Sequence, residues 1–307
     1  MGVKKKILFV HQNFPAQYKH LANYFADNKD FEVHTLSITK YEDDRMENHH
    51  YTPQSSSTPN INQFSIEFET KMIRAESVAV KALALKKNNF NPDLILGHPG
   101  WGETIFLKEI WPDCPLISYV EFYYKTRDCD IDFDIDLLKE VKGDVDRFLN
   151  FTRLKLMARN SYFSQSYLIS DYLVCPTEFQ KDQLPDIFRD KIDIIHDGID
   201  TNKLKPEEDV SFKVNDVTLT NKDNVISYIS RSLDPYRGFH IFIKSIPGIL
   251  EKNPEANILI VGNPDTPGYG SPLKEGRFKE YFYSRIEGKI DTSRVHFLGF
   301  LKYEDDL

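Results

Sequence analysis

Short apolar runs and helical repeats of apolar residues alternate along this chain. Residues 7–10 are fully apolar, which is typical of a strand buried in a parallel sheet, and residues 31–38 predict a second strand. Residues 17–28, between them, repeat apolar positions at helical spacing. The pattern continues, with strands predicted within 92–103, 114–124, 170–176 and 191–200, and helices over 68–89, 104–111, 145–168 and 178–184, the last capped by Thr177.

Repeated strand–helix alternation predicts an α/β fold with parallel sheets covered by helices. We expect a first domain over residues 1–200, a polar linker over 201–223, and a second strand–helix series over 224–307. The second series is short for an α/β domain with both sheet faces covered, so we expect it to be incomplete. Residues 41–63 are polar and rich in Ser, Asn and Pro, and predict a loop.

Composition narrows the class of protein. The chain has 307 residues, 40% of them hydrophobic, and a formal net charge of -8, which argues against nucleic acid as a partner. Its three cysteines are scattered, as expected of free thiols in a reducing compartment. No apolar run suits a signal peptide or a membrane span, so we expect a cytoplasmic protein, with contact at the inner face of the membrane left open.

One turn carries a distinctive set of charges. Arg231 and Arg237 follow a predicted strand, and Gly238 then opens a helix. Guanidinium groups and the free N–H groups of a helix start both bind phosphate oxygens, and glycine lets the backbone approach a ligand. The set therefore predicts a diphosphate site, although two surface arginines beside a proline turn would show the same spacing.

Other turns after predicted strands also carry polar side chains. "HQNFP" holds His11 and Asn13, and "GHPGWGE" holds His98 and Glu103, while Glu121 lies near the end of the next strand. Ligands of open parallel sheets bind beyond the carboxyl ends of strands, so these side chains are candidates. Imidazole and carboxylate groups can both hydrogen-bond hydroxyl groups of a ligand. Helix capping is the alternative for His98, and a purely structural role is the alternative for the carboxylates.

The order of these segments resembles one enzyme family. The Arg231–Gly238 turn resembles the donor-diphosphate motif of retaining glycosyltransferases of family 4, which have the GT-B fold, although the gap is one residue longer and Arg237 replaces a lysine. Further matching segments are "KILFVHQNFPAQYKHLANYFA", "PDLILGHPGWGETIFLKEIWPDCPLISYVEFYY", "PTEFQ", "KIDIIHDGIDTNKLKP", "ILIVGNPD" and "VHFLGFLKYEDDL".

The resemblance implies two Rossmann-like domains and transfer of a sugar from a nucleoside diphosphate sugar to a glycan or lipid-linked acceptor, with retention. It implies that Arg231, Arg237 and Gly238 bind the donor diphosphate and that Gly262 approaches the nucleotide. It also implies that His98 acts near the donor sugar. His11, Asn13 and Glu103 would face the cleft beside it, and no metal or other cofactor is expected.

The resemblance also leads us to expect a truncated second domain. The family's acidic segment for the donor ribose would follow the point where "KYEDDL" ends the chain. Weak donor binding, little turnover and self-association through an uncovered sheet would follow. The runner-up is therefore a non-catalytic remnant that binds a glycan or a partner chain. A nucleotide-sugar epimerase is a third reading.

Two sets of residues raise the question of a metal. Asp128–Asp136 alternates Asp with apolar residues, which would suit the metal-dependent GT-A fold, but it lacks the Gly and Glu of a calcium loop. A half-buried strand or a solvated flap is the simpler prediction. His49 and His50 lie in a polar segment with no other ligand at metal spacing, so no metal site is predicted there.

Overall fold

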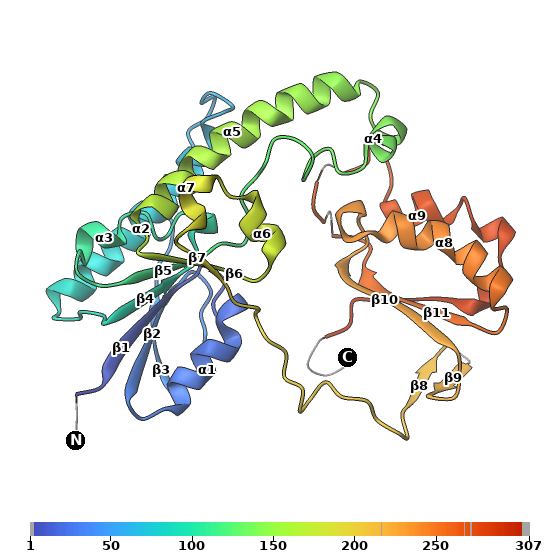
Figure 1. Cartoon of the computed structure of the whole chain (residues 1–307), viewed down its shortest axis with the longest axis horizontal. Coiled ribbons are helices and arrows are strands. Elements are labelled where there is room, and N and C mark those ends of the chain that lie inside the picture. The colour runs from blue at the N-terminus through green and yellow to red at the C-terminus, as the bar shows by residue number, and fades with distance from the viewer. Residues whose placement is uncertain (1–2, 216, 267, 271, 303–307) are drawn as a thin grey trace. The chain divides into compact units, whose positions relative to one another are not determined.

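The computed structural model describes residues 3–215, 217–266, 268–270 and 272–302 (Figure 1). The chain divides into two compact units, Met1–Ile199 and Asp200–Leu307. Each unit has its own parallel sheet, so each is described by itself. Among the described residues, no helix combines the length and the apolar character that crossing a membrane would need.

Unit 1 is built on a sheet of seven parallel strands in the order β3-β2-β1-β4-β5-β6-β7. The bounds are β1 Lys5–Val10, β2 Phe31–Ser37, β3 Met46–His50, β4 Leu94–Gly97, β5 Leu116–Tyr119, β6 Tyr172–Cys175 and β7 Ile192–Ile194. The apolar runs form strands because parallel strands are covered on both faces and must be apolar on both.

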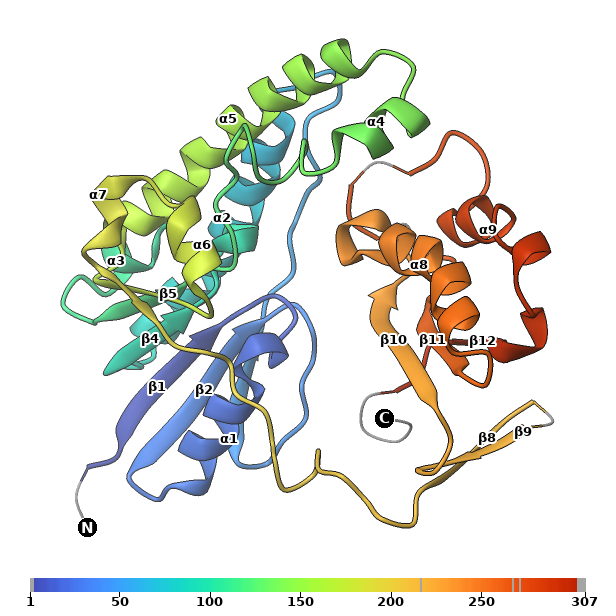
Figure 2. The same ribbon diagram turned by 45° about the vertical axis from the view of Figure 1, so that its right-hand side comes forward.

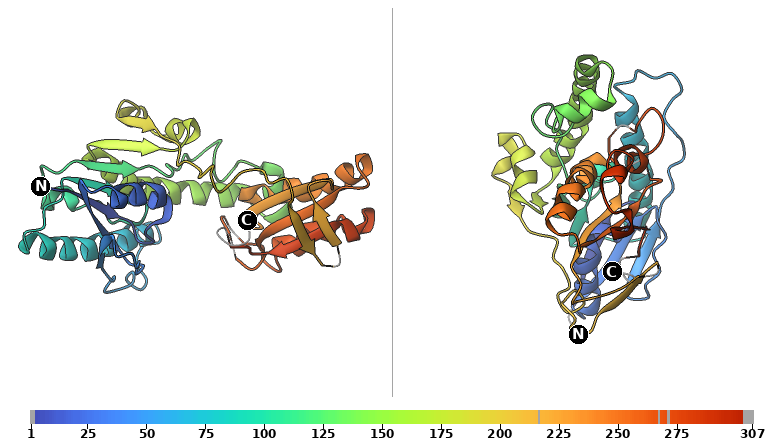
Figure 3. Two further views of the ribbon diagram at one scale, coloured as in Figure 1. Left: turned by 90° about the horizontal axis from the view of Figure 1, so that it is seen from below. Right: turned by 90° about the vertical axis from the view of Figure 1, so that its right-hand side faces the viewer.

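Helices connect these strands. Their bounds are α1 Lys19–Asp27, α2 Ile66–Lys87, α3 Leu107–Ile110, α4 Ile135–Val141, α5 Val145–Ile169, α6 Glu178–Gln183 and α7 Asp186–Arg189, with 3-10 turns at Ala16–Tyr18 and Pro99–Trp101. The longest is α5, with 25 residues (Figure 3). The predicted cap of α6 is confirmed, because the hydroxyl of Thr177 accepts a hydrogen bond from the N–H of Gln180.

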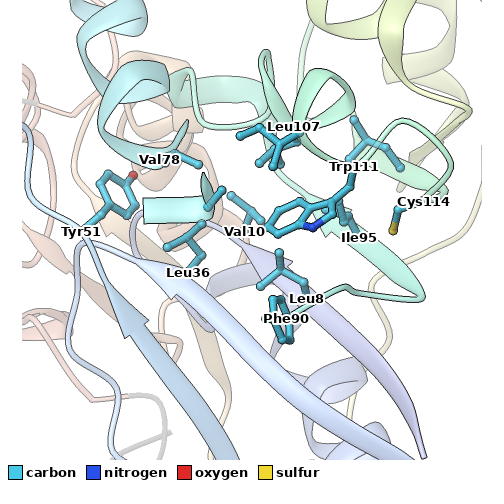
Figure 4. Packing of buried hydrophobic residues seen from close by; sticks show 13 residues of the cluster. Leu8, Val10, Leu36, Tyr51, Val78, Phe90, Ile95, Leu107, Trp111 and Cys114 are labelled. Atoms are coloured by element: carbon cyan, nitrogen blue, oxygen red, sulfur yellow. The ribbon is translucent and has the colours of Figure 1, made fainter. Parts of the chain in front are cut away.

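Alternate residues of β1 serve the two faces of the sheet. Leu8 and Val10 pack with side chains of α2 and α3, including Val78 and Leu107 (Figure 4). On the other face, Phe9 packs with α1 and the turn before it. Burial of these apolar faces stabilises the unit and fixes the positions of the carboxyl ends of the strands along one edge of the sheet.

Unit 2 has a parallel sheet in the order β10-β11-β12 and an antiparallel hairpin. The bounds are β8 Ser211–Val214, β9 Val217–Thr220, β10 Val225–Ser232, β11 Asn257–Asn263, β12 Val295–Gly299, α8 Phe239–Lys252 and α9 Phe278–Tyr283. The helices α8 and α9 lie next to one another (Figure 2), and their Phe239 and Phe282 rings are 6.5 Å apart.

Three segments differ from the sequence-based expectation. The loop predicted over 41–63 is wrong at Met46–His50, because β3 pairs there with β2 despite its polar sequence. The segment 201–223, expected to be a polar linker, holds the β8–β9 hairpin. Residues 128–134 form turns, so the half-buried strand is wrong and the flap remains of the two alternatives. The carboxylate of Asp134 then caps α4 by accepting from the N–H of Leu137.

Candidate functional site

The direction of strand order changes between β1 and β4. From β1 the sheet runs through β2 to β3 on one side and through β4 to β7 on the other. Ligands of open parallel sheets bind at the carboxyl ends of the strands beside such a switch. His11 directly follows β1 and His98 directly follows β4, and their ring centroids are 4.8 Å apart. The structure therefore brings two predicted site residues together.

Backbone hydrogen bonds set the proton positions on both rings. The N–H of Asn13 donates to Nδ1 of His11 at 2.9 Å, and the N–H of Gly100 donates to Nδ1 of His98 at 3.1 Å. Each Nδ1 is thus an acceptor, so a neutral ring carries its proton on Nε2. Burial, followed by the nearby charge of His98, lowers the pKa of His11 to about 3, which keeps His11 neutral.

Glu121, two residues after the end of β5, completes this polar group. One of its carboxylate oxygens lies 3.3 Å from Nε2 of His98, the nitrogen that bears the proton. The nearby imidazole of His98 lowers the pKa of Glu121, so its carboxylate stays charged. The Glu121 side chain is 49% exposed, whereas the His98 side chain is 2% exposed. A partly exposed carboxylate therefore lies beside a buried pair of imidazole rings.

Two further residues, which no sequence motif indicated as site residues, join this group. The ring of Tyr119, the last residue of β5, stacks on His98 with centroids 5.7 Å apart. Its hydroxyl donates to both carboxylate oxygens of Asp197, at 3.0 and 3.1 Å. Asp197 lies three residues after the end of β7. Its place after a strand was the only signal that could have identified it.

Glu103 and Asn13 occupy different surroundings. Glu103 is fully buried and accepts a hydrogen bond of 2.9 Å from the hydroxyl of Tyr51, while its other oxygen has no partner among the described residues. Burial raises its pKa. Asn13 is exposed beside His11. The Glu103 carboxyl is therefore buried beneath the turn that follows β4, whereas Asn13 is open to solvent.

The turn between β10 and α8 holds the predicted diphosphate residues. Arg231 is exposed near the end of β10, and Arg237 is half-buried in a 3-10 turn, Pro235–Arg237. Nε of Arg237 lies 3.7 Å from a carboxylate oxygen of Asp234, which also accepts from the hydroxyl of Ser232 at 2.6 Å. Gly238 precedes α8 with a φ of 76°, a conformation that favours glycine.

The segment after β11 packs onto this turn. The guanidinium carbon of Arg237 lies 5.4 Å from the centroid of the Tyr269 ring. A Cβ added to Gly268 would lie 2.3 Å from a carboxylate oxygen of Asp234. At Gly262, a Cβ would lie 2.6 Å from the Leu233 side chain. Close packing against Leu233 therefore requires a glycine at this position.

A separate cluster could hold a metal ion. His34, Glu47 and His49 each offer a ligand atom, and these atoms all lie within 4.8 Å of one another. The pairing of β2 with β3 brings His34 to His49, which the sequence spacing did not reveal.

Comparison with known proteins defines the class. The model of the glycosyl transferase family 4 group matches residues 30–204. This match covers more than half of the chain, and the chain belongs to this family. No curated protein matches it.

Solved structures agree in fold, with TM-scores of 0.50 to 0.54 for three of them. A putative UDP-N-acetylglucosamine 2-epimerase from Listeria monocytogenes is 13% identical, over 99% of this chain and 71% of that one, with a TM-score of 0.53. WaaG, a glycosyltransferase of lipopolysaccharide biosynthesis, is 12% identical over 96% and 70%, with a TM-score of 0.50. The catalytic domain of starch synthase IV from Arabidopsis thaliana, bound to ADP and acarbose, is 13% identical over 98% and 75%, with a TM-score of 0.54. The fold is that of GT-B glycosyltransferases.

Proposed function

We propose that this chain transfers a sugar from a nucleoside diphosphate sugar to a hydroxyl of a glycan or a lipid-linked acceptor, with retention. Family membership and fold support a role in sugar transfer. The observation that carries the proposal for the donor is the β10–α8 turn. There Arg237 lies beside the start of a 14-residue helix, whose dipole favours an anion at this end.

The two arginines have distinct roles in this proposal. Arg237 is held by Asp234 and Tyr269, so its guanidinium is already ordered before a ligand arrives. Arg231 is exposed and can turn toward the phosphates when they bind. The two positive charges would stabilise the negative charge that develops on the leaving diphosphate, which is electrostatic stabilisation of the transition state. ADP bound to starch synthase IV supports the same class of donor.

The polar group of unit 1 would act on the sugars. The Nε2–H of His98 can donate a hydrogen bond to a sugar hydroxyl, and the carboxylate of Glu121 can accept one from an acceptor hydroxyl. His11 is neutral and buried, so it holds this arrangement without adding a charge. These roles need no metal.

Titration calorimetry tests the donor site. UDP, GDP, ADP and their sugars are titrated into the full chain, into an Arg231→Ala/Arg237→Ala variant, and into an Arg294→Ala control. Arg294 pairs with Glu255 near the amino ends of the strands, opposite to the turn. Loss of a charged hydrogen bond costs roughly 1.5–3 kcal/mol, so we expect about tenfold to hundredfold weaker binding in the double variant.

The same titrations separate the alternatives. Nucleotide binding that the double variant retains would contradict the assigned donor site. A folded chain that binds no nucleotide would contradict the transferase proposal and favour a non-catalytic glycan-binding protein. The likeness to a putative epimerase raises one more alternative, which consumption of the bound donor without any acceptor would reveal.

A further inference from the structure

The pairing of β2 with β3 places three potential ligands on one face of the sheet. His34 pairs with Glu47, and Leu36 pairs with His49. Side chains two residues apart on a strand point to the same face, so His34, Glu47 and His49 share the face on which Leu36 packs against α2. The two histidine rings are stacked, with an angle of 11° between their planes, and both are buried.

Glu32 orients the first histidine. One of its carboxylate oxygens lies 2.7 Å from Nε2 of His34, so Nε2 carries a proton and donates it. The lone pair of Nδ1 then points toward Nε2 of His49, which is 3.1 Å away. A histidine that donates one N–H to a carboxylate and offers its other nitrogen is the usual arrangement of a metal-binding histidine and its supporting carboxylate.

The distances suit a small divalent ion. The Glu47 oxygens lie 3.6 Å from Nδ1 of His34 and 3.9 Å from Nε2 of His49. Two nitrogens bound to tetrahedral zinc at about 2.0–2.1 Å are about 3.3 Å apart. The two imidazole nitrogens already lie 3.1 Å apart, so small movements would admit the ion.

We propose that His34 Nδ1, His49 Nε2 and the Glu47 carboxylate bind one divalent transition-metal ion of the zinc class, with Glu32 positioning His34. Two imidazoles and one carboxylate favour zinc over magnesium or calcium, which prefer sets of oxygen ligands. Since the Glu47 side chain is 64% exposed, a water molecule can reach the fourth position. When the ion binds to Nε2 of His49, the proton of that ring moves to Nδ1, so the change of tautomer releases no proton.

Charges around the cluster favour a cation overall. The positive charge of Lys81 on α2 opposes a cation near His49. The two carboxylates of Glu32 and Glu47 favour a cation and outnumber the lysine. The ion would join the edge strand β3 to β2. Tyr51, the residue after β3, donates its hydroxyl to Glu103 beneath the turn that holds His98. Metal binding would thus hold in place a strand that leads to the candidate site.

Metal titration tests this inference. The full chain, without a histidine tag and stripped with EDTA, is titrated with Zn²⁺ and with Co²⁺, whose visible absorption reports four-coordinate binding. We expect one ion per chain and a higher melting temperature with Zn²⁺. Glu47→Gln and His49→Gln should each weaken binding by at least about tenfold, and Glu32→Gln by about tenfold to hundredfold.

Control variants keep the test decisive. His50→Gln changes the exposed neighbour on the opposite face and should leave binding unchanged. Glu47 is exposed, so its variant should fold even if His49→Gln does not, and circular dichroism checks both. Absence of Zn²⁺ binding to the folded chain would overturn the proposal, and so would binding that Glu47→Gln and His49→Gln leave intact.

Discussion

At the scale of single residues, His11 shows how burial affects stability. Its ring is 3% exposed and next to His98, and its pKa is about 3, whereas an exposed histidine has a pKa near 6.5. Between these values the unfolded chain binds more protons than the folded chain. The free energy of unfolding therefore rises with pH across this range and falls on acidification.

A His11→Asn variant should remove this dependence. The Asn side chain can still accept from the N–H of Asn13, but it does not titrate. We expect the wild type to lose about 1.6 kcal/mol more than the variant between pH 6.5 and 5, as measured by urea unfolding. His20→Asn, at an exposed site on α1, is the control. Equal losses in wild type and His11→Asn would show that His11 is not the source.

Glu103 has the opposite pH dependence. Burial raises its pKa, so the folded chain binds the proton more tightly, and the stability that this residue contributes is lost as pH rises. Glu103→Gln keeps an oxygen for the Tyr51 hydroxyl without the charge. We expect its melting temperature, relative to wild type, to be higher at pH 8 than at pH 4.5. The same difference at both pH values would contradict the prediction.

At the scale of elements, the turn after β4 depends on close packing against α2. The ammonium group of Lys71, on α2, donates a hydrogen bond of 2.6 Å to the carbonyl of Gly100 and lies over the Trp101 ring. Burial lowers its pKa to about 8. The hydroxyl of Tyr162 on α5 also donates to the carbonyl of Pro99. These contacts fix the turn that presents His98.

Gly102 makes this packing testable. Its φ is 115°, and a Cβ there would lie 2.2 Å from the carbonyl oxygen of Lys71, inside α2. Neither backbone can move easily, so Gly102→Ala should lower the free energy of unfolding by about 3 kcal/mol or more. Gly143→Ala, where a Cβ meets nothing within 4 Å, should change it by less than about 1 kcal/mol. Similar losses in both variants, measured by urea unfolding, would refute this account.

At the scale of the whole molecule, the chain consists of two units, and the segment that leads into β8 is exposed. Residues 201–213 are all exposed, and the first part of this range, before β8, contains Lys203 and Lys205. Exposed segments with few buried contacts open at little cost and are cut first by proteases. The two units should therefore separate on limited digestion.

Trypsin provides the measurement. Lys205 precedes Pro206, and trypsin does not cut such bonds, so we expect an early cut after Lys203 that yields residues 1–203 and 204–307. Mass spectrometry of the first fragments identifies the site. Lys203→Gln should suppress that cut while the folded chain remains intact. Early cleavage within α2 or α8 would contradict this division of the chain.

The sequence by itself determined the features that depend on neighbouring residues. Residues 7–10 had to form a buried strand because they are apolar on both faces, and Thr177 had to begin a helix because its hydroxyl accepts a nearby N–H. Arg237 and Gly238 were likewise placed at a strand-to-helix turn by local pattern alone. Periodicity and capping act over a few residues, so they can be read from one chain.

Only the tertiary structure decided which distant residues meet. His34 contacts His49 because two strands pair, Tyr119 contacts Asp197 across strand ends, and Tyr51 reaches Glu103 through the core. The polar strand β3 forms because β2 supplies backbone partners, which its own sequence could not indicate. Side chains far apart in sequence are brought together by sheet order and burial, and these are properties of the whole fold.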